Sequence, residues 1–319
     1  MQITFWKIQG AGNDFVVYDN RNVSFELSDE QVRRICDRHF GVGADGVIEV
    51  RTSPRPECVA FMHYRNADGS LAEMCGNGVR CFALYLKEQG LLSEEEQAAC
   101  SFVIDTLAGP KPLAYEVDEQ GAFEKATVIM GEPAFAPERI PTSLVATQEI
   151  VISNSNLEAE RMEPAVVQAA VSLPQGSYLV TCVNMGNPHA VVFLEDQDAQ
   201  TAESFVRCPE GFDLETPGSL LEAHTGLFPQ KTNVEFAAVS GANRIRMRVF
   251  ERGVGETLAC GTGACATAVA ALIQGKADRA LPVAIELSGG ILEVAWLPTN
   301  LVTLTGPAQK VFEGTLSLE

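Results

Sequence analysis

The chain has 319 residues, of which 46% are hydrophobic and 20% charged, so it is long enough for two globular domains and too apolar to be disordered. Its net charge of −19, without a cluster of Lys and Arg, argues against nucleic-acid binding. No apolar run approaches the roughly 20 residues that cross a bilayer, and no secretory signal is visible at the N-terminus. We therefore expect a cytoplasmic protein that binds neither membranes nor nucleic acids.

The first half of the chain predicts short strands and two helices. Residues 3–8 and 15–18 alternate as strands and flank a glycine-rich loop that places Asn13 at a turn. Ser28 begins a capping box, and apolar residues at helical spacing follow it until Gly41. Further strands are expected at 47–50, 59–64, 101–106, 112–117 and 126–130, with a hairpin turn at 118–121 and a helix from Cys75 to about Glu88.

The second half repeats this alternation after a break. A segment rich in proline and polar residues at 131–141 is the candidate linker, and the weak pattern at 142–176 indicates a surface insertion. Strands are then expected near 178–183, 190–194, 234–238, 244–250, 282–287, 291–296 and 302–305, and helical segments near 199–206 and 220–224.

The nine cysteines and four histidines form neither a disulfide framework nor a metal site. The cysteine number is odd and the spacing irregular, unlike that of secreted disulfide-rich domains. The cysteine pairs 75/81 and 260/265 are too widely spaced for the short pairs of zinc sites, and the histidines are scattered. No lysine context typical of pyridoxal phosphate is visible. We expect no metal and no organic cofactor.

A glycine-rich pattern at 41–46 resembles the dinucleotide-binding fingerprint. It follows a predicted helix and leads into a predicted strand, which reverses the order that the fingerprint requires. A dinucleotide site is therefore not expected there.

Two stretches share a cysteine followed by Gly-x-Gly and then by a helical run. Cys75 precedes Gly76, Asn77 and Gly78, and Cys260 precedes Gly261, Thr262 and Gly263. Each thiol is expected at a helix N-terminus, where unpaired backbone N–H groups and the helix dipole favour a thiolate and attract a carboxylate. The pair predicts two thiols that face one another across a ligand.

The repeat extends beyond the cysteines. Asn13 lies in Gly-Asn-Asp-Phe-Val-Val, 62 residues before the first cysteine, and Asn187 lies in Gly-Asn-Pro-His-Ala-Val-Val, 73 residues before the second. Nine residues before each cysteine a polar residue ends an apparent strand, Asn66 in one half and Glu251 in the other. The sequence thus predicts two copies of one αβ unit, arranged as a pseudo-symmetric pair of domains.

Six blocks stand in order along the chain: Gly-Asn-Asp-Phe at 12–15, Asn-Ala-Asp-Gly at 66–69, Met-Cys-Gly-Asn-Gly at 74–78, Met-Gly-Asn-Pro-His at 185–189, Glu-Arg-Gly at 251–253 and Ala-Cys-Gly-Thr-Gly at 259–263. This set resembles the diaminopimelate epimerases, which are cofactor-independent amino-acid epimerases. The resemblance implies an α+β fold of two pseudo-symmetric domains, each a curled, mostly antiparallel sheet around a central helix.

The same resemblance implies domain boundaries and an assembly. Residues 1–131 with 306–319 would form the half that carries Cys75, and residues 132–305 the half that carries Cys260. A final strand near 311–318 would return to the first half, and the protein would be a homodimer.

Inversion of an amino-acid α-carbon requires removal of a proton from one face and delivery of a proton to the other. Two fixed thiols, one ionised and one protonated, can do this because the reference pKa of cysteine, about 8.5, can be tuned toward neutrality. Backbone N–H groups of Gly76, Asn77, Gly261 and Thr262 would bind the substrate carboxylate and stabilise the charge that develops on it.

By resemblance, Cys75 and Cys260 would convert LL-2,6-diaminopimelate to the meso form, in lysine and cell-wall precursor synthesis. The matching motifs also assign six substrate-binding residues: Asn13, Asn66, Asn187, Asn233, Glu251 and Arg252. Of these, Glu251 would hold the ammonium and Arg252 the carboxylate at the far end of the substrate.

Other interpretations stay open. The same two-thiol chemistry could act on proline, hydroxyproline or glutamate, although a proline pocket has no distal amino-acid group to hold. A non-catalytic thiol protein, redox-active or metal-binding, is the alternative from another class. His189 is expected to orient a loop or to lie beneath the site, and Cys81 and Cys265 are expected in the core.

Overall fold

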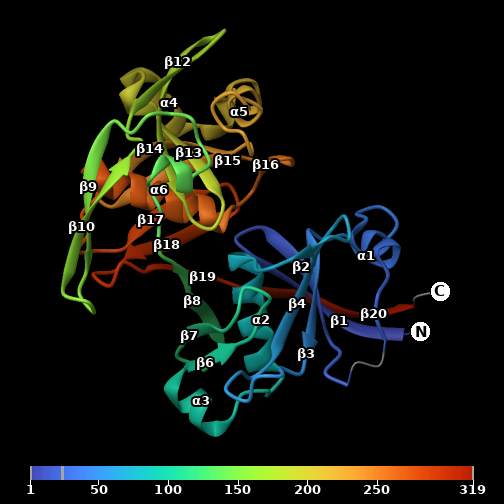
Figure 1. Cartoon of the computed structure of the whole chain (residues 1–319). Helices are drawn as coiled ribbons and strands as arrows, with labels where there is room; N and C mark the ends of the chain where they lie inside the picture. Colours follow the sequence, from blue (N-terminus) through green and yellow to red (C-terminus); the bar gives the residue numbers. More distant parts are fainter. Residues whose placement is uncertain (1, 23–24, 318–319) are drawn as a thin grey trace. The chain divides into compact units, whose positions relative to one another are not determined.

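The computed structural model describes residues 2–22 and 25–317, and the chain forms two compact units (Figure 1). Unit 1 comprises Met1–Ile129 with Thr305–Glu319, and unit 2 comprises Met130–Leu304. Strands dominate both units and few helices accompany them, which confirms the predicted α+β class. Among the described residues, no helix is both long enough and apolar enough to cross a membrane.

The main sheet of unit 1 has the strand order β20-β1-β2-β3-β4-β5. These strands are β1 (Gln2–Gly10), β2 (Asn13–Asp19), β3 (Gly46–Arg51), β4 (Phe61–Asn66), β5 (Leu71–Ala72) and β20 (Gln309–Ser317). β2 and β3 run parallel, with Phe15 opposite Gly46, and the other neighbours run antiparallel. β20 lies beside β1, with Leu316 opposite Ile3, and Leu318 lies outside the described residues.

Three further strands of unit 1 pair as antiparallel hairpins: β6 (Ser101–Ile104), β7 (Lys111–Val117) and β8 (Phe123–Gly131). The predicted turn at 118–121 joins β7 to β8, where the Gly121 N–H donates to the Asp118 carbonyl at 2.9 Å. A parallel bridge between Phe61 and Asp105 connects the end of β6 to β4.

The central helix of unit 1 is α2 (Gly76–Glu88), which starts directly after Cys75 as predicted. It packs against β1, β2 and β4, and its residues from Gly76 to Leu86 are buried. This burial fixes the position of its N-terminus and therefore that of the thiol in front of it.

The surface helices of unit 1 are α1 (Asp29–Cys36) and α3 (Glu94–Ala99), and α3 was not predicted. The capping box at Ser28 is confirmed, but α1 ends at Cys36 rather than at Gly41. The Asp37 carboxylate accepts the backbone N–H groups of His39 and Phe40, at 2.7 and 2.8 Å. A turn closed by this side chain therefore takes the place of further helix.

Unit 2 repeats the strand pattern of unit 1. Its corresponding strands are β12 (Gly176–Asn184), β13 (Pro188–Phe193), β14 (Asn233–Gly241), β15 (Arg244–Glu251) and β16 (Gly255–Thr257). β13 and β14 run parallel, with His189 opposite Asn233, whereas β12/β13, β14/β15 and β15/β16 run antiparallel. The order antiparallel, parallel, antiparallel, antiparallel is that of β1 to β5, so the predicted repeat is present in the fold.

The central helix of unit 2 is α6 (Gly261–Ile273), which starts directly after Cys260. It packs against β12 to β15 and against two of the strands that follow it, β17 (Val283–Leu287) and β18 (Gly290–Trp296), as Figure 1 shows. β19 (Val302–Pro307) comes next and leads into β20 of unit 1. Each unit therefore surrounds one buried helix with its strands.

Two helices cover the far side of the unit 2 strands. α4 (Ala199–Arg207) lies close to the predicted 199–206, whereas α5 (Glu215–Glu222) begins before the predicted 220–224. Their apolar faces pack with the strands into a core cluster that includes Phe205, Leu221 and Phe236.

The segment 142–176 forms strands, although its pattern predicts only a surface insertion. β9 (Gln148–Asn154) and β10 (Ala159–Ala165) make a separate two-stranded sheet, and β11 (Ala169–Leu173) pairs with β12. Ile150 and Ile152 are buried while Val151 between them is 51% exposed. An apolar residue on the exposed face hides the alternation from which a strand is predicted.

Candidate active site

Cys75 is the N-cap residue of α2. Its backbone is extended (φ −137°, ψ 118°), and its Sγ accepts a hydrogen bond from the Gly78 N–H at 3.5 Å. Gly76 and Asn77 form the first turn of α2. The backbone N–H groups of a first turn point out of the helix N-terminus. The thiol, which is partly exposed, therefore lies beside the backbone donors that the sequence predicts for an anion.

One of the predicted amide residues, Asn13, lies at this thiol. Asn13 Oδ1 is 3.8 Å from Cys75 Sγ and accepts a hydrogen bond from Asn77 Nδ2 at 3.2 Å. Asn13 Nδ2 donates to Asp45 Oδ2 at 2.6 Å. These contacts hold the Asn13 amide with its carbonyl toward Cys75.

A network of charged residues fixes the loop that carries Asn13. Asp14 pairs with Lys7 at 2.7 Å and with Arg38 at 2.8 Å, and Arg38 also pairs with Asp45 at 2.6 Å. Burial raises the pKa of Asp14, but the hydrogen bonds and charges of Arg38 and Lys7 outweigh it and lower the pKa to about 2. The Asp14 and Asp45 carboxylates each accept the backbone N–H of the other, so they order the loop.

Asn66 is the last residue of β4, as predicted. Its Oδ1 accepts from the Tyr64 hydroxyl at 2.9 Å, and its Nδ2 donates to Ser70 Oγ at 3.0 Å. One contact lies within β4 and the other within the turn that follows it, and together they orient the amide.

Arg80 is a residue of this site that the sequence interpretation missed. It is fully buried, and its guanidinium donates to the Gly76 carbonyl at 3.2 Å, to Asn77 Oδ1 at 2.9 Å and to the Pro307 carbonyl at 3.4 Å. Arg80 thereby ties the first turn of α2 to the segment that follows unit 2. The available signal was a charged residue within an otherwise apolar helix face.

Cys260 caps α6 in the same way. Its backbone is extended (φ −122°, ψ 112°), its Sγ accepts from the Gly263 N–H at 3.4 Å, and the Thr262 hydroxyl lies 3.5 Å away. Cys260 is more buried than Cys75, with 5% of its surface exposed. The predicted placement of both thiols at helix starts is therefore confirmed.

The protonation of Cys260 differs from the expectation that a helix N-terminus favours its thiolate. Burial raises the pKa of Cys260 well above the ordinary value of a thiol, and the charges of Glu251 and Glu235 raise it further. The hydrogen bonds from Thr262 and Gly263 act in the opposite direction but are smaller. In the free protein, burial and two carboxylates keep this thiol protonated.

Glu251 and Arg252, predicted as a pair, have different surroundings. Burial raises the pKa of Glu251, and its carboxylate interacts with the Thr257 hydroxyl and with Cys260. Arg252 is exposed, and its Nη1 donates to the Gln230 carbonyl at 3.1 Å. Glu251 thus lies at the thiol, whereas Arg252 is exposed and bonded to the Gln230 carbonyl.

The two asparagines predicted in unit 2 are held by hydrogen bonds. Asn187 Oδ1 lies 3.0 Å from His189 Nε2, and His189 Nδ1 lies 2.7 Å from Glu235 Oε1. Asn233 is 3% exposed; it donates from Nδ2 to the Pro188 carbonyl at 3.0 Å and accepts the Arg252 N–H at 2.9 Å. Asn233 therefore joins β13 to the turn after β15.

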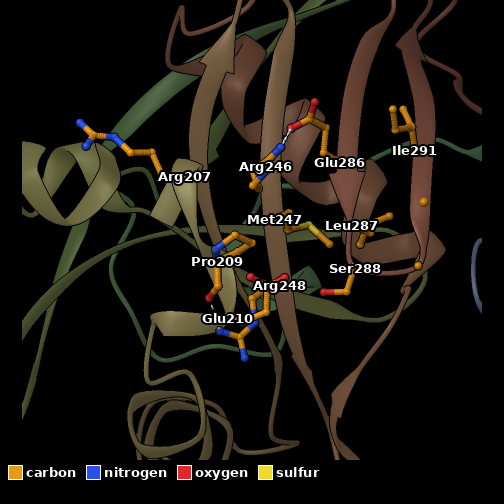
Figure 2. A pocket seen from close by; sticks show the side chains of 12 residues that line it. Arg207, Pro209, Glu210, Arg246, Met247, Arg248, Glu286, Leu287, Ser288 and Ile291 are labelled. Carbon is orange, nitrogen blue, oxygen red and sulfur yellow. Dashed lines mark hydrogen bonds and ion pairs between the residues drawn. The ribbon is translucent and has the colours of Figure 1, made fainter. Parts of the chain in front are cut away.

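A cavity elsewhere on unit 2 is a poor candidate for the site. It measures about 520 Å³, and its lining includes Arg246, Arg248 and Glu286 but not Cys260 (Figure 2). Arg246 pairs with Glu286 at 2.9 Å, and Arg248 pairs with Glu256 at 2.7 Å. Because these charged groups already neutralise one another, the cavity offers a ligand little unpaired charge. Within residues 2–22 and 25–317, no group of three or more His, Cys, Asp and Glu could hold a metal ion.

Solved structures share the fold. A hydroxyproline epimerase from Agrobacterium vitis, with trans-4-hydroxy-L-proline bound, superposes with a TM-score of 0.67 at 14% identity, covering 99% of this chain and 91% of the other. At this identity the likeness concerns the fold alone.

Sequence comparisons identify the family. The family model described as "Diaminopimelate epimerase" matches residues 5–136 and 181–311. A diaminopimelate epimerase of Thermosynechococcus vestitus is 43% identical, covering 99% of this chain and 100% of the relative. A chloroplastic diaminopimelate epimerase of Oryza sativa subsp. japonica is 41% identical, covering 98% of this chain and 79% of the relative. The fold is duplicated, a cysteine caps the central helix of each half, and the sequence similarity extends over the full chain. This chain therefore belongs to the diaminopimelate epimerase family.

Proposed function

We propose that this protein interconverts LL- and meso-2,6-diaminopimelate, without a cofactor, by a two-thiol mechanism. The observation that carries the proposal is the equivalent placement of Cys75 and Cys260, each capping the central helix of its own unit. The family relationship supplies the substrate. The reaction would serve lysine and cell-wall precursor synthesis.

In this mechanism the two thiols act on opposite faces of one α-carbon. The thiolate of one cysteine removes the α-proton, and the thiol of the other delivers a proton to the opposite face, which inverts the centre. The N–H groups of Gly76 and Asn77 in α2, and of Gly261 and Thr262 in α6, bind the α-carboxylate as negative charge develops on it. After one turnover the protonation states of the thiols are exchanged, which matches the reverse reaction.

The protonation of Cys260 supports different roles for the two thiols, one as acid and the other as base. Because burial and two carboxylates raise its pKa, Cys260 is a neutral thiol in the free protein and can donate a proton. A mechanism with one protonated and one ionised cysteine needs such a group on one side of the substrate.

The amides and charged residues of the site would select the substrate. Asn13, Asn66, Asn187 and Asn233 supply or position amide groups. Arg252 is exposed, and its guanidinium has further N–H groups, besides the one bonded to Gln230, with which to bind a carboxylate. We assign the Glu251 carboxylate, which lies in the same unit as Cys260, to the ammonium group at the far end of the substrate. A substrate with amino-acid groups at both ends would use all of these contacts.

The test replaces each cysteine by serine and measures epimerisation by α-deuterium incorporation in D₂O. We expect Cys75→Ser and Cys260→Ser each to lower turnover by a factor of about 10² to 10⁴, the usual contribution of a positioned acid or base. Cys208→Ser, at an exposed cysteine outside both helices, is the matched control and should keep full activity. Retention of most activity by either active-site variant would refute the two-thiol mechanism.

The substrate assignment is tested on a panel. LL-Diaminopimelate, proline, hydroxyproline and glutamate are incubated with the protein in D₂O, and we expect label only in diaminopimelate. Label in proline or glutamate instead would identify the alternative racemase. Loss of activity that a thiol reductant restores would show that a disulfide inactivates the enzyme; absence of activity on every substrate in the reduced protein would favour a non-catalytic thiol protein.

The family relationship also leads us to propose a cytoplasmic homodimer. Light scattering after size-exclusion chromatography measures the mass of the assembly, and a mass near 34.3 kDa, that of one chain, would contradict the dimer.

A further inference from the structure

The duplicated fold allows positions in unit 2 to be compared with their counterparts in unit 1. Phe15 of β2 and His189 of β13 hold the same place in the two parallel strand pairs. The strand partner of Phe15 is Gly46 in β3, and that of His189 is Asn233 in β14. Ile48 and Glu235 each lie two residues after these partners, so they are also counterparts. The side chains of all four counterparts are fully buried.

Unit 1 fills these two places with apolar groups, whereas unit 2 fills them with an ionisable pair. His189 Nδ1 lies 2.7 Å from Glu235 Oε1, and both side chains are 0% exposed. Glu235 Oε2 has no hydrogen-bond partner in the part of the chain that the structure describes. Burying such groups is costly unless they are fully paired. Because unit 1 builds the same scaffold without them, the fold does not require the pair.

The pair lies directly beneath the start of α6. A Cβ placed on Gly263 would come within 2.8 Å of Glu235 Oε1 and 3.3 Å of Cys260 Sγ. The corresponding Cβ on Gly78 of α2 would instead meet the apolar tips of Met62 and Ile48, at 3.0 and 3.2 Å. The carboxylate of Glu235 is thus a feature of the Cys260 helix that the Cys75 helix lacks.

The other side of the pair reaches the proposed substrate site. His189 Nε2 lies 3.0 Å from Asn187 Oδ1, so both ring nitrogens face oxygen atoms. Glu235 thereby sets the rotation of the imidazole, and the imidazole in turn orients the Asn187 amide. The chain Glu235, His189, Asn187 runs from beneath α6 to a residue proposed to bind substrate.

We propose that Glu235 is a positioning residue for epimerisation: it orients His189 toward Asn187 and places a second negative charge, besides that of Glu251, beside Cys260. This inference rests on the proposed function. It predicts that Glu235 acts on the rate of the chemical step through its neighbours, without touching the substrate.

The ionisable groups around this carboxylate come from several strands. They include His189 on β13, Glu251 on β15 and the Cys182 thiol on β12. Burial raises the pKa of Cys182 to about 12, and the charge of Glu235 contributes to the rise. Removing the charge of Glu235 should make Cys260 easier to ionise, since a neighbouring negative charge opposes formation of a thiolate.

The experiment uses Glu235→Gln in the full chain, which keeps the shape of the side chain and removes its charge. We expect kcat to fall by about tenfold to a hundredfold, the effect of a misplaced catalytic group, with KM changed less than about threefold. The rate of Cys260 alkylation by iodoacetamide is followed against pH by mass spectrometry, with fragment ions separating Cys260 from Cys265. Its midpoint should move down by about one pH unit or more.

The control is Glu286→Gln, at a carboxylate of unit 2 that pairs with Arg244 and Arg246 of β15. It should leave both the kcat and the alkylation midpoint unchanged. If Glu235→Gln fails to fold, the double variant His189→Phe with Glu235→Ile, which copies the packing of unit 1, gives the same two readouts.

An alkylation midpoint of Cys260 equal to that of the wild type, in a folded Glu235 variant, would overturn the proposal. This readout does not depend on any substrate. If the wild-type protein fails to epimerise diaminopimelate, the proposed function is contradicted, and the alkylation midpoint still decides whether Glu235 places charge beside Cys260.

Discussion

Alanine at Gly263 tests how firmly Glu235 is held beneath α6. A methyl group at this position would lie 2.8 Å from Glu235 Oε1, whereas ordinary contact requires 3.4 to 4 Å. The carboxylate would have to move by about 0.6 Å while it is fully buried and bonded to His189. Overpacking of this kind costs about 1–3 kcal/mol, and alanine in a helix recovers about 0.5–1 kcal/mol relative to glycine. We expect Gly263→Ala to lower the free energy of unfolding by up to about 2.5 kcal/mol, the larger cost less the smaller gain.

The matched variant is Gly78→Ala in α2. Its new methyl group would meet Met62 Cε at 3.0 Å and Ile48 Cδ1 at 3.2 Å, and the flexible end of Met62 can move aside. Gly78→Ala should therefore leave the free energy of unfolding nearly unchanged. Urea unfolding of both variants and of the wild type, followed by circular dichroism, measures the difference. If Gly263→Ala is as stable as Gly78→Ala, the carboxylate is not fixed in the position described, and the reasoning is wrong.

Two further predictions concern unit 1. Because the pKa of Asp14 is lowered from 3.8 to about 2, the ionised carboxylate contributes stability above about pH 4 that is lost as the pH falls through about 2. The contribution is roughly 2 kcal/mol, so urea unfolding between pH 2 and 5 should show a steeper loss in the wild type than in Asp14→Asn; parallel pH profiles would contradict this. Arg80→Lys should lower the free energy of unfolding by about 2–3 kcal/mol, because an ammonium cannot reach the three carbonyl oxygens that the buried guanidinium contacts. Thermal unfolding measures this loss, and a melting temperature equal to that of the wild type would count against it.

The helix starts could be predicted from the sequence because the signals are local. A cysteine before Gly-x-Gly and an apolar run set the beginning of both α2 and α6, and the capping box at Ser28 set the beginning of α1. The end of α1 could not be predicted in the same way. Asp37 competes for the backbone N–H groups of its neighbours, and the outcome of that competition is not visible in the apolar spacing.

Other elements lacked a readable pattern. β16 has three residues, Gly255–Thr257, which is too short for any alternation. In β9 the exposed Val151 breaks the contrast between the two faces of the strand. Strands of this kind form because of partners distant in sequence, so the residue pattern of one sequence does not predict them.

The candidate site was predictable in its residues and less so in their environment. The placement of Cys260 follows from the motif, but the rise in its pKa depends on Glu251 and Glu235, which only the strand register brings to it. Glu235 occupies a strand that reads as ordinary buried sheet. Only the strand pairing shows that Glu235 takes the place that Ile48 has in unit 1, and the sequence alone does not give that pairing.

The pairing of β20 with β1 has a consequence for synthesis. β1 is made before unit 2 and β20 only after it, so a nascent chain on the ribosome carries the sheet of unit 1 with the β1 edge uncovered. An open strand edge readily pairs with other chains, so this interval is when the protein is most exposed to aggregation and most in need of chaperones.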